Sequence, residues 1–168
     1  MEAPCQCILA NPSFEMPGSG VVFGGWNQFG PVGASYGNPT HGAIAARVSG
    51  PDTGDWGVSG YWQPFDCEPG EQWTASVKAW HTSVDPLTGG SSAILNIEWR
   101  SNSGNLIDYE SHTVLGSSTP LDNVVEFSVV SGPAPTGTAS TRILLGVLQD
   151  PAEPAPDAFF DEVTFYSL

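Results

Sequence analysis

The chain has 168 residues and a mass of 17.7 kDa, the size of one domain with a sizeable core. Its 20 glycines and 15 prolines interrupt the sequence too often for a helical bundle, while 40% hydrophobic residues argue against a disordered chain. Four basic residues stand against 18 acidic ones, for a net charge of −14. Phosphate binding requires clustered lysine and arginine, so nucleic acid and anionic membranes are not expected as partners. No apolar run in the sequence is long enough to span a bilayer.

Alternating apolar and polar residues, broken by Gly, Pro, Asn and Asp, recur along the chain and are typical of an all-β sandwich. We expect a single domain over residues 1–168, with about ten strands in two antiparallel sheets. The predicted strands, in chain order, are Gln6–Ala10, Gly25–Phe29, Ala43–Val48, Gly57–Phe65, Gln72–Trp80, Ser92–Arg100, Asn105–Glu110, Asn123–Val130, Thr141–Leu148 and Ala158–Tyr166. The predicted loops are Pro31–Pro39, Pro86–Gly90, Ser101–Gly104, Gly132–Gly137 and Pro151–Pro156.

Two of these strands have one apolar and one polar face. The predicted core-facing residues are Trp73, Ala75, Val77 and Ala79 in one strand, and Leu95, Ile97 and Trp99 in the other. The opposite face of the second strand carries Asn96, Glu98 and Arg100. A polar sheet face with occasional aromatic residues is either solvated surface or a platform for sugars, and the pattern alone leaves both open.

Three cysteines, Cys5, Cys7 and Cys67, allow at most one internal disulfide, from Cys67 to either of the other two. Their spacing is a poor match to a zinc site, which normally has four ligands at short spacings. The first residues lack the basic start and apolar stretch of a secretory signal peptide. If the protein is exported, the sequence represents the mature domain.

Five short motifs follow one another along the chain. L-A-N-P-S-F-E occupies residues 9–15 and G-G-W residues 24–26; P-G-E-Q-W-T follows at 69–74, A-P-T-G-T-A at 134–139 and F-F-D-E-V-T-F at 159–165. In this order the motifs resemble carbohydrate-binding modules appended to bacterial xylanases and glucanases. The resemblance covers residues 8–166 and implies a galactose-binding-like jelly-roll fold. Trp73 stands where that family usually has Tyr, and Glu162 replaces a second Asp.

The resemblance also implies a structural calcium ion. Glu15 and Asp161 match the positions that supply its side-chain oxygens, and backbone carbonyls near Ser13 and in the His41–Ala43 turn would complete the site. Calcium accepts six to eight oxygen ligands, many of them backbone carbonyls. The alternative is that both carboxylates are ordinary surface groups.

Sugar rings stack on exposed aromatic side chains, and their hydroxyls pair with polar side chains. Trp56, in a Gly-rich segment, and Tyr109, after a turn, match positions where related modules stack sugars, and Gln149 matches a polar ligand contact. We therefore expect a binding site formed by Trp56, Tyr109, Asn96, Glu98, Arg100 and Gln149, with Trp80 as a further candidate. We expect Trp26, Trp73 and Trp99 in the core; Gln63 could bind a hydroxyl or satisfy a buried backbone group.

The expected function is a non-catalytic module that binds a β-linked polysaccharide, is secreted or on the cell surface, and is a monomer. The net charge argues against strongly anionic glycans, unless calcium bridges them. One alternative is an exported adhesion or structural domain without a sugar site. Another is a glycosidase, which would need two flanking carboxylates such as Glu98 with Asp108 or Glu110. The histidines share no metal-binding spacing.

Overall fold

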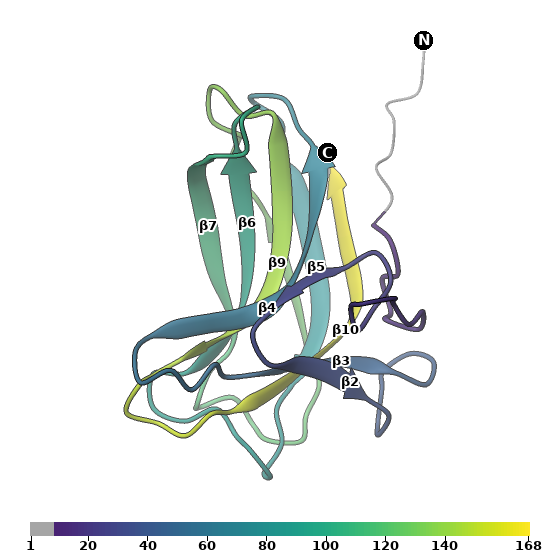
Figure 1. Ribbon diagram of the computed structural model, residues 1–168, viewed down its shortest axis with the longest axis vertical. Coiled ribbons are helices and arrows are strands. Elements are labelled where there is room, and N and C mark those ends of the chain that lie inside the picture. The colour runs from purple at the N-terminus through teal and green to yellow at the C-terminus, as the bar shows by residue number, and fades with distance from the viewer. Residues whose placement is uncertain (1–8) are drawn as a thin grey trace.

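The computed structural model describes residues 9–168, which form an all-β sandwich without a helix in that range (Figure 1). The ten strands are β1 (Asn27–Phe29), β2 (Val32–Ser35), β3 (Ala45–Ser49), β4 (Gly57–Asp66), β5 (Trp73–Trp80), β6 (Ser92–Arg100), β7 (Leu106–Leu115), β8 (Val125–Val130), β9 (Ser140–Gln149) and β10 (Asp157–Ser167). In the described range, no helix is long and apolar enough to cross a membrane.

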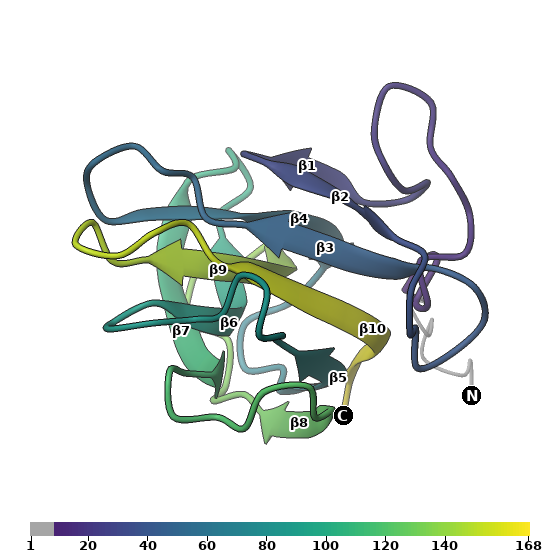
Figure 2. The same ribbon diagram turned by 90° about the horizontal axis from the view of Figure 1, so that it is seen from below.

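The strands form two antiparallel five-stranded sheets, which pack face to face (Figure 2). Sheet 1 has the order β1-β4-β9-β6-β7, and sheet 2 has the order β2-β3-β10-β5-β8. Neighbouring strands in each sheet are mostly distant in sequence. Residues from widely separated segments therefore share one face. The outer face of each sheet is not part of the core between the sheets and is available for binding. The expected two-sheet antiparallel sandwich is confirmed.

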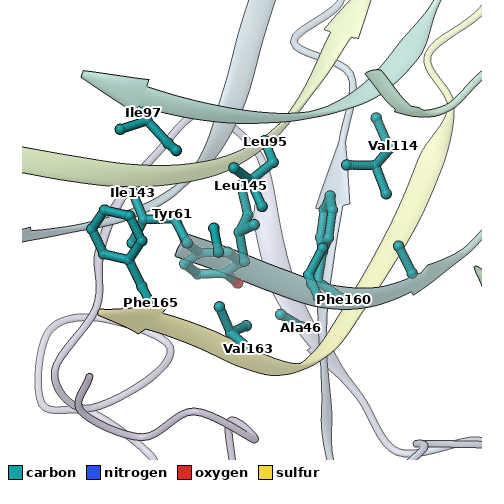
Figure 3. Packing of buried hydrophobic residues seen from close by; sticks show 14 of the residues in the cluster. Ala46, Tyr61, Leu95, Ile97, Val114, Ile143, Leu145, Phe160, Val163 and Phe165 are labelled. Carbon is teal, nitrogen blue, oxygen red and sulfur yellow. The ribbon is translucent and has the colours of Figure 1, made fainter. Parts of the chain in front are cut away.

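The core lies between the inner faces of the two sheets (Figure 3). Sheet 1 contributes Tyr61, Leu95, Ile97, Ile143 and Leu145, and sheet 2 contributes Ala46, Phe160, Val163 and Phe165. The predicted core positions of Trp26, Trp73 and Trp99 are confirmed, since each side chain is 2% exposed. Trp73 stacks on Phe165 with ring centroids 4.7 Å apart. The alternation of β5 and β6 thus divides core from surface as the sequence predicts.

The residues of the two N-terminal motifs, 9–15 and 24–26, form a hydrogen-bonded turn, which we call the N-terminal corner. Asn11 adopts a left-handed φ of 49°, which asparagine tolerates better than most residues. Its Nδ2 donates to the carbonyls of Met16 and Gly24, and its Oδ1 accepts from the Met16 N–H. The indole N–H of Trp26 donates to the Asn11 carbonyl at 3.0 Å, and Phe14 packs on Trp26 with centroids 5.1 Å apart. The asparagine, phenylalanine and tryptophan of the motifs therefore determine the fold and do not bind ligand.

The strand boundaries agree with the sequence prediction in the middle of the chain and differ near its start. β6 has the predicted bounds, whereas β7 continues beyond the predicted Glu110 to Leu115. The predicted loop Pro31–Pro39 is wrong in part, because Val32–Ser35 forms β2, paired with β3 at the edge of sheet 2. A proline just before an edge strand removes no ladder hydrogen bond, so Pro31 is compatible with β2. Of the predicted strand Gln6–Ala10, residues 6–8 lie outside the described range, and residues 9 and 10 are not in a strand.

Candidate functional site

The outer face of sheet 1 brings together most of the predicted binding residues. Strand register aligns Trp62, Leu144, Asn96 and Ser111 in one row across the sheet, and Pro64, Arg142, Glu98 and Tyr109 in the next. Arg100 follows in a third row, opposite Ser140. These side chains share a face because antiparallel partners on paired strands point the same way. The arrangement joins residues from four strands into one polar and aromatic surface, which we call the sheet 1 face.

Aromatic rings lie near opposite ends of the sheet 1 face. Tyr109, on edge strand β7, is 54% exposed, and Trp56, just before β4, is 56% exposed. The Trp56 ring reaches across to the start of β6, since a Cβ on Gly90 would lie 2.8 Å from its Cη2 atom. From Ser92 to Glu98 the face extends about 20 Å, at roughly 3.3 Å per residue. The face is therefore long enough for several sugar residues.

Two glycines lie on the outer face of sheet 1, in the row between that of Val58 and that of Trp62. Gly60 and Gly146 lie opposite each other in the β4–β9 pair. A Cβ on Gly60 would be 2.2 Å from the Leu145 carbonyl oxygen, and one on Gly146 would be 2.7 Å from that of Ser59. The close approach of the strands thus excludes any larger residue at either position. The side chains of Val58 and Leu144 flank this pair, since a Cβ on Gly146 would lie 3.1 Å from Val58 Cγ1 and 3.2 Å from Leu144 Cδ2.

The charged groups of the sheet 1 face are unequally paired. Arg100 donates from Nε and Nη2 to Glu98 Oε2, at 3.3 and 3.2 Å, and from Nη1 to the Gly104 carbonyl at 3.0 Å. Arg142 instead stacks over the Trp62 ring, with Cζ 3.8 Å from the centroid. Burial, and then the nearby Arg100 charge, lowers the pKa of Arg142, while Glu98 opposes this shift. A single carboxylate therefore lies beside two guanidinium groups.

Two buried polar atoms on this face lack partners among the described residues. They are the Asn96 Oδ1 acceptor and the Arg142 Nε donor. Each unpaired group costs about 1–3 kcal/mol when water is excluded. They lie in adjacent rows on neighbouring strands, and both are covered by protein atoms, so a ligand would reach them only after a side-chain movement. A ligand with hydroxyl or carboxylate oxygens would pair the Arg142 donor, and one with hydroxyl hydrogens would pair the Asn96 acceptor.

The structure does not place Gln149 or Trp80 with the other predicted site residues. Gln149 is 3% exposed, and its amide accepts from the Asp52 N–H at 2.7 Å and donates to the Glu153 carbonyl at 3.1 Å. Gln149 therefore connects the loops that contain Asp52 and Glu153. Trp80 lies on the outer face of sheet 2, is 6% exposed, and stacks on Phe159 at 5.6 Å. It lines a separate hollow of about 210 Å³ together with Asn38, Thr82, Asp122 and Val124.

Gln63, left open by the sequence, satisfies buried backbone. Its Oε1 accepts from the Ala10 N–H at 3.1 Å, and its Nε2 donates to the Ala10 carbonyl at 2.7 Å. Trp62 and Arg142, by contrast, lie on the sheet 1 face, and the sequence analysis did not name them as candidates. Tyr61 and Trp62 are adjacent aromatics in one strand, so one of them had to face outward, and that signal was available.

The carboxylates considered for glycosidase chemistry do not share a face. Glu98 pairs with Tyr109, whereas Asp108 and Glu110 pair with Trp99 and Ile97, whose side chains face the core. Glu110 accepts from the Gly132 N–H at 2.8 Å and lies 3.2 Å from the His112 ring. No pair of opposed acids therefore forms from these three residues.

The residues predicted to bind calcium gather around one turn. Asp161 is fully buried; its Oδ2 accepts from the N–H groups of Thr40 and His41, and its Oδ1 accepts from that of Glu162. Burial raises the pKa of Asp161, and these hydrogen bonds oppose the shift. Glu15 accepts from the N–H groups of two further turn residues, Ala43 and Ile44. Ser13 and His41 line a shared hollow of about 380 Å³ beside Glu162.

This donor set is compatible with calcium. Carboxylates have about four acceptor positions each, so Glu15 and Asp161 retain unused ones. The buried Thr40 hydroxyl has no hydrogen-bond partner among the described residues and supplies a further hard oxygen. In the described range, no group of three or more His, Cys, Asp and Glu side chains could hold a metal, so backbone carbonyls would have to complete the coordination shell.

The cysteine prediction lies only partly in the described range. Cys67 is 4% exposed, and burial raises the pKa of its thiol to about 12. Cys5 and Cys7 lie outside the described residues, so the disulfide stays a prediction. A buried, protonated thiol is unreactive.

The fold is that of carbohydrate-binding modules of the jelly-roll type. No protein-family model matches the chain, and no curated protein matches its sequence. Among solved structures, the CBM22-1 xylan-binding domain of Paenibacillus barcinonensis Xyn10C has a TM-score of 0.62 at 15% identity, covering 99% of this chain and 97% of that one. TmCBM61, solved with β-1,4-galactotriose, has a TM-score of 0.55 at 14% identity, covering 96% and 97%.

A longer protein is also similar. The enzymatically active domain of tailspike protein 4 from bacteriophage CBA120 has a TM-score of 0.65 at 16% identity, and 95% of this chain is covered. This chain spans only 21% of the length of that protein. At these identities the comparisons establish the shared fold, and the expected jelly-roll resemblance is confirmed on that basis.

Proposed function

We propose that this domain is a non-catalytic carbohydrate-binding module that binds a β-linked polysaccharide along the sheet 1 face. The observation that carries the proposal is the alignment of Trp62, Asn96, Arg142, Glu98 and Tyr109 in two adjacent rows. The similarity to modules described as binding xylan and β-1,4-galactotriose supports the proposal. Association of such modules with secreted enzymes supports an extracellular location.

Binding would use aromatic contact at the ends of the face and hydrogen bonds in its middle. Exposed Trp56 and Tyr109 offer flat apolar surfaces to the C–H faces of sugar rings. Asn96 and Arg142 would offer their unpaired, buried polar atoms to ring hydroxyls after a side-chain movement, and the Arg100–Glu98 ion pair holds both of its side chains in fixed positions. The Gly60–Gly146 pair adds no side chain to the face between its aromatic ends, so the face favours internal segments of a glycan over chain ends.

The test is a glycan panel. Affinity electrophoresis would compare the protein on gels containing xylan, mixed-linkage glucan, galactan, arabinoxylan or acidic polysaccharides. At least one glycan should retard migration, and the double variant Trp62→Ala/Tyr109→Ala should migrate as in the glycan-free gel. A reducing-sugar assay on the same panel should show no hydrolysis. Retardation by no glycan would contradict the proposal and favour the adhesion or structural alternative.

We also propose that calcium occupies the turn held by Glu15 and Asp161. The ion would be held by these carboxylates, the Thr40 hydroxyl and backbone carbonyls near Ser13 and His41. Bound calcium supplies positive charge and tight oxygen coordination, which would fix the N-terminal corner to β10. Because the folded state alone holds the turn together, binding would stabilise the domain by mass action.

A further inference from the structure

The sheet 1 face lacks the acidic excess of the whole chain. The protein carries four basic residues against 18 acidic ones, yet two of those four, Arg100 and Arg142, lie in adjacent rows of this face. One carboxylate, Glu98, lies between them in the middle of the face, and Asp66 stands at its end, opposite Ser140. The two arginines are therefore balanced by two carboxylates, so the region between β4, β9 and β6 lacks the acidic excess of the whole chain.

Of the two arginines on the sheet 1 face, Arg142 is the one without a paired carboxylate. Arg100 uses all three guanidinium nitrogens, toward Glu98 and the Gly104 carbonyl. Arg142 has no hydrogen bond or ion pair with any described residue, and its Nε is buried. Its planar group is nonetheless held in place, 3.8 Å above the Trp62 ring. A partly buried guanidinium without an anion has a cost in the free protein, so the position fits a ligand that brings the anion.

We propose that the sheet 1 face selects an acidic polysaccharide, with the carboxylate of a uronic acid residue paired to Arg142. This inference rests on the proposed function and names the class of glycan. A carboxylate matches the planar guanidinium fork in paired hydrogen bonds, which a single sugar hydroxyl cannot do. The neighbouring Asn96 Oδ1 is an acceptor and would take a hydroxyl hydrogen of the same residue. A sugar that carries both a carboxylate and hydroxyl groups would pair with the Arg142 donor and with the Asn96 acceptor.

Tyr109 and Trp62 flank the proposed carboxylate position. Tyr109 stands in the same row as Arg142, across Glu98, and Trp62 stands in the next row on β4. A uronate with its carboxylate over Arg142 can therefore lay its ring toward either aromatic side chain. The repulsion expected from the net charge of −14 acts over the whole molecule and is screened within about 10 Å at ordinary ionic strength. Direct contact with Arg142 is not screened in the same way.

The experiment compares each acidic polysaccharide with its own carboxyl-reduced form. The probes are glucuronoxylan, polygalacturonate and alginate, which differ in backbone, and binding is measured by affinity electrophoresis and calorimetry. For at least one backbone, the acidic form should bind roughly 10- to 100-fold more tightly than its reduced form, the range for a hydrogen bond to a charged group. A sulfated glycan serves as a further arm and should bind less well than the best carboxylated one.

Three variants separate the local charge from the total charge. Arg142→Gln should bring the affinity for the acidic form to that for the reduced form, and Arg142→Lys, which keeps the charge but not the fork, should lose part of the preference. Lys78→Gln removes the same charge from sheet 2, where Lys78 pairs with Glu162, and should preserve the preference. Circular dichroism and thermal melting would confirm that each variant is folded.

The outcomes distinguish the two proposals. Equal or weaker binding of the acidic forms, with clear binding to neutral glycans, overturns the uronate inference and leaves the proposed function standing. An acid preference that survives Arg142→Gln in a folded protein overturns the role of Arg142. Tighter binding of the sulfated glycan overturns selection for a carboxylate. Binding to no glycan of either kind overturns the inference and the proposed function together.

Discussion

Replacing Tyr109 with Ala should weaken glycan binding while the domain stays folded. The ring is 54% exposed, so about half of its roughly 200 Å² is buried in the folded protein. At about 25 cal/mol per Å², truncation costs at most about 2 kcal/mol of the free energy of unfolding, and this is an upper bound. Loss of an aromatic stacking contact costs about 1–3 kcal/mol of binding, by analogy with base stacking, or roughly 5- to 150-fold in Kd.

The chain offers a matched control in Tyr166. This tyrosine is 51% exposed and lies near the end of β10, in sheet 2. Tyr166→Ala should therefore lower the melting temperature by a similar amount, at most about 8 °C for a domain of this size. It should leave the Kd unchanged. Tyr109→Phe, which keeps the ring, should bind nearly as the unmodified protein does. Calorimetry would refute the reasoning if folded Tyr109→Ala binds normally, or if Tyr166→Ala weakens binding equally.

The remaining predictions concern the core, the metal and the thiols. Trp73→Ala should lower the free energy of unfolding by about 3–5 kcal/mol in urea denaturation, because the ring is 2% exposed and stacked on Phe165; a loss below about 1 kcal/mol would contradict this packing. Removal of calcium with EDTA should lower the melting temperature, and Glu15→Gln should abolish that response; metal analysis finding no calcium, with an unchanged melting temperature, would argue against the site. Thiol titration of the denatured, non-reduced protein should find one free thiol if Cys67 is bridged, and three free thiols would exclude the disulfide.

Local patterns were sufficient to predict the strands and their faces. In β6, strict alternation separates Leu95 and Ile97, both fully buried, from Asn96 and Glu98 on the outer face. The pleat of a strand depends only on its own backbone, so a period of two in the sequence is enough for this assignment. The same alternation puts Trp80 on the face of β5 opposite to that of Ala79. It could not show that β5 belongs to sheet 2, and Trp80 therefore lies away from the other candidates.

Pairing between distant strands determines the rest of the site. Trp62 and Arg142 are 80 positions apart in sequence and meet because β4 pairs with β9. Local alternation shows that one of Tyr61 and Trp62 faces outward, but no local period contains the β4–β9 pairing that brings Trp62 to Arg142. Gln149 shows the converse. Its position in the sequence matches a binding residue of related modules, but in this fold the Asp52 and Glu153 backbones take up its amide.

The two faces of sheet 1 differ in role. The inner face packs in the core, and the outer face carries the two unpaired polar atoms. The inner faces of β4, β6 and β9 supply fully buried Tyr61, Leu95 and Leu145 to a continuous core. That core stabilises the sandwich enough to tolerate an unpaired Asn96 acceptor and an unpaired Arg142 donor on the opposite side. A surface selected only for solubility would expose such groups to water, where they cost nothing. Here both atoms are buried and Arg142 is stacked on Trp62. Under the proposed function, the free energy lost by leaving them unpaired would be recovered when a ligand pairs them.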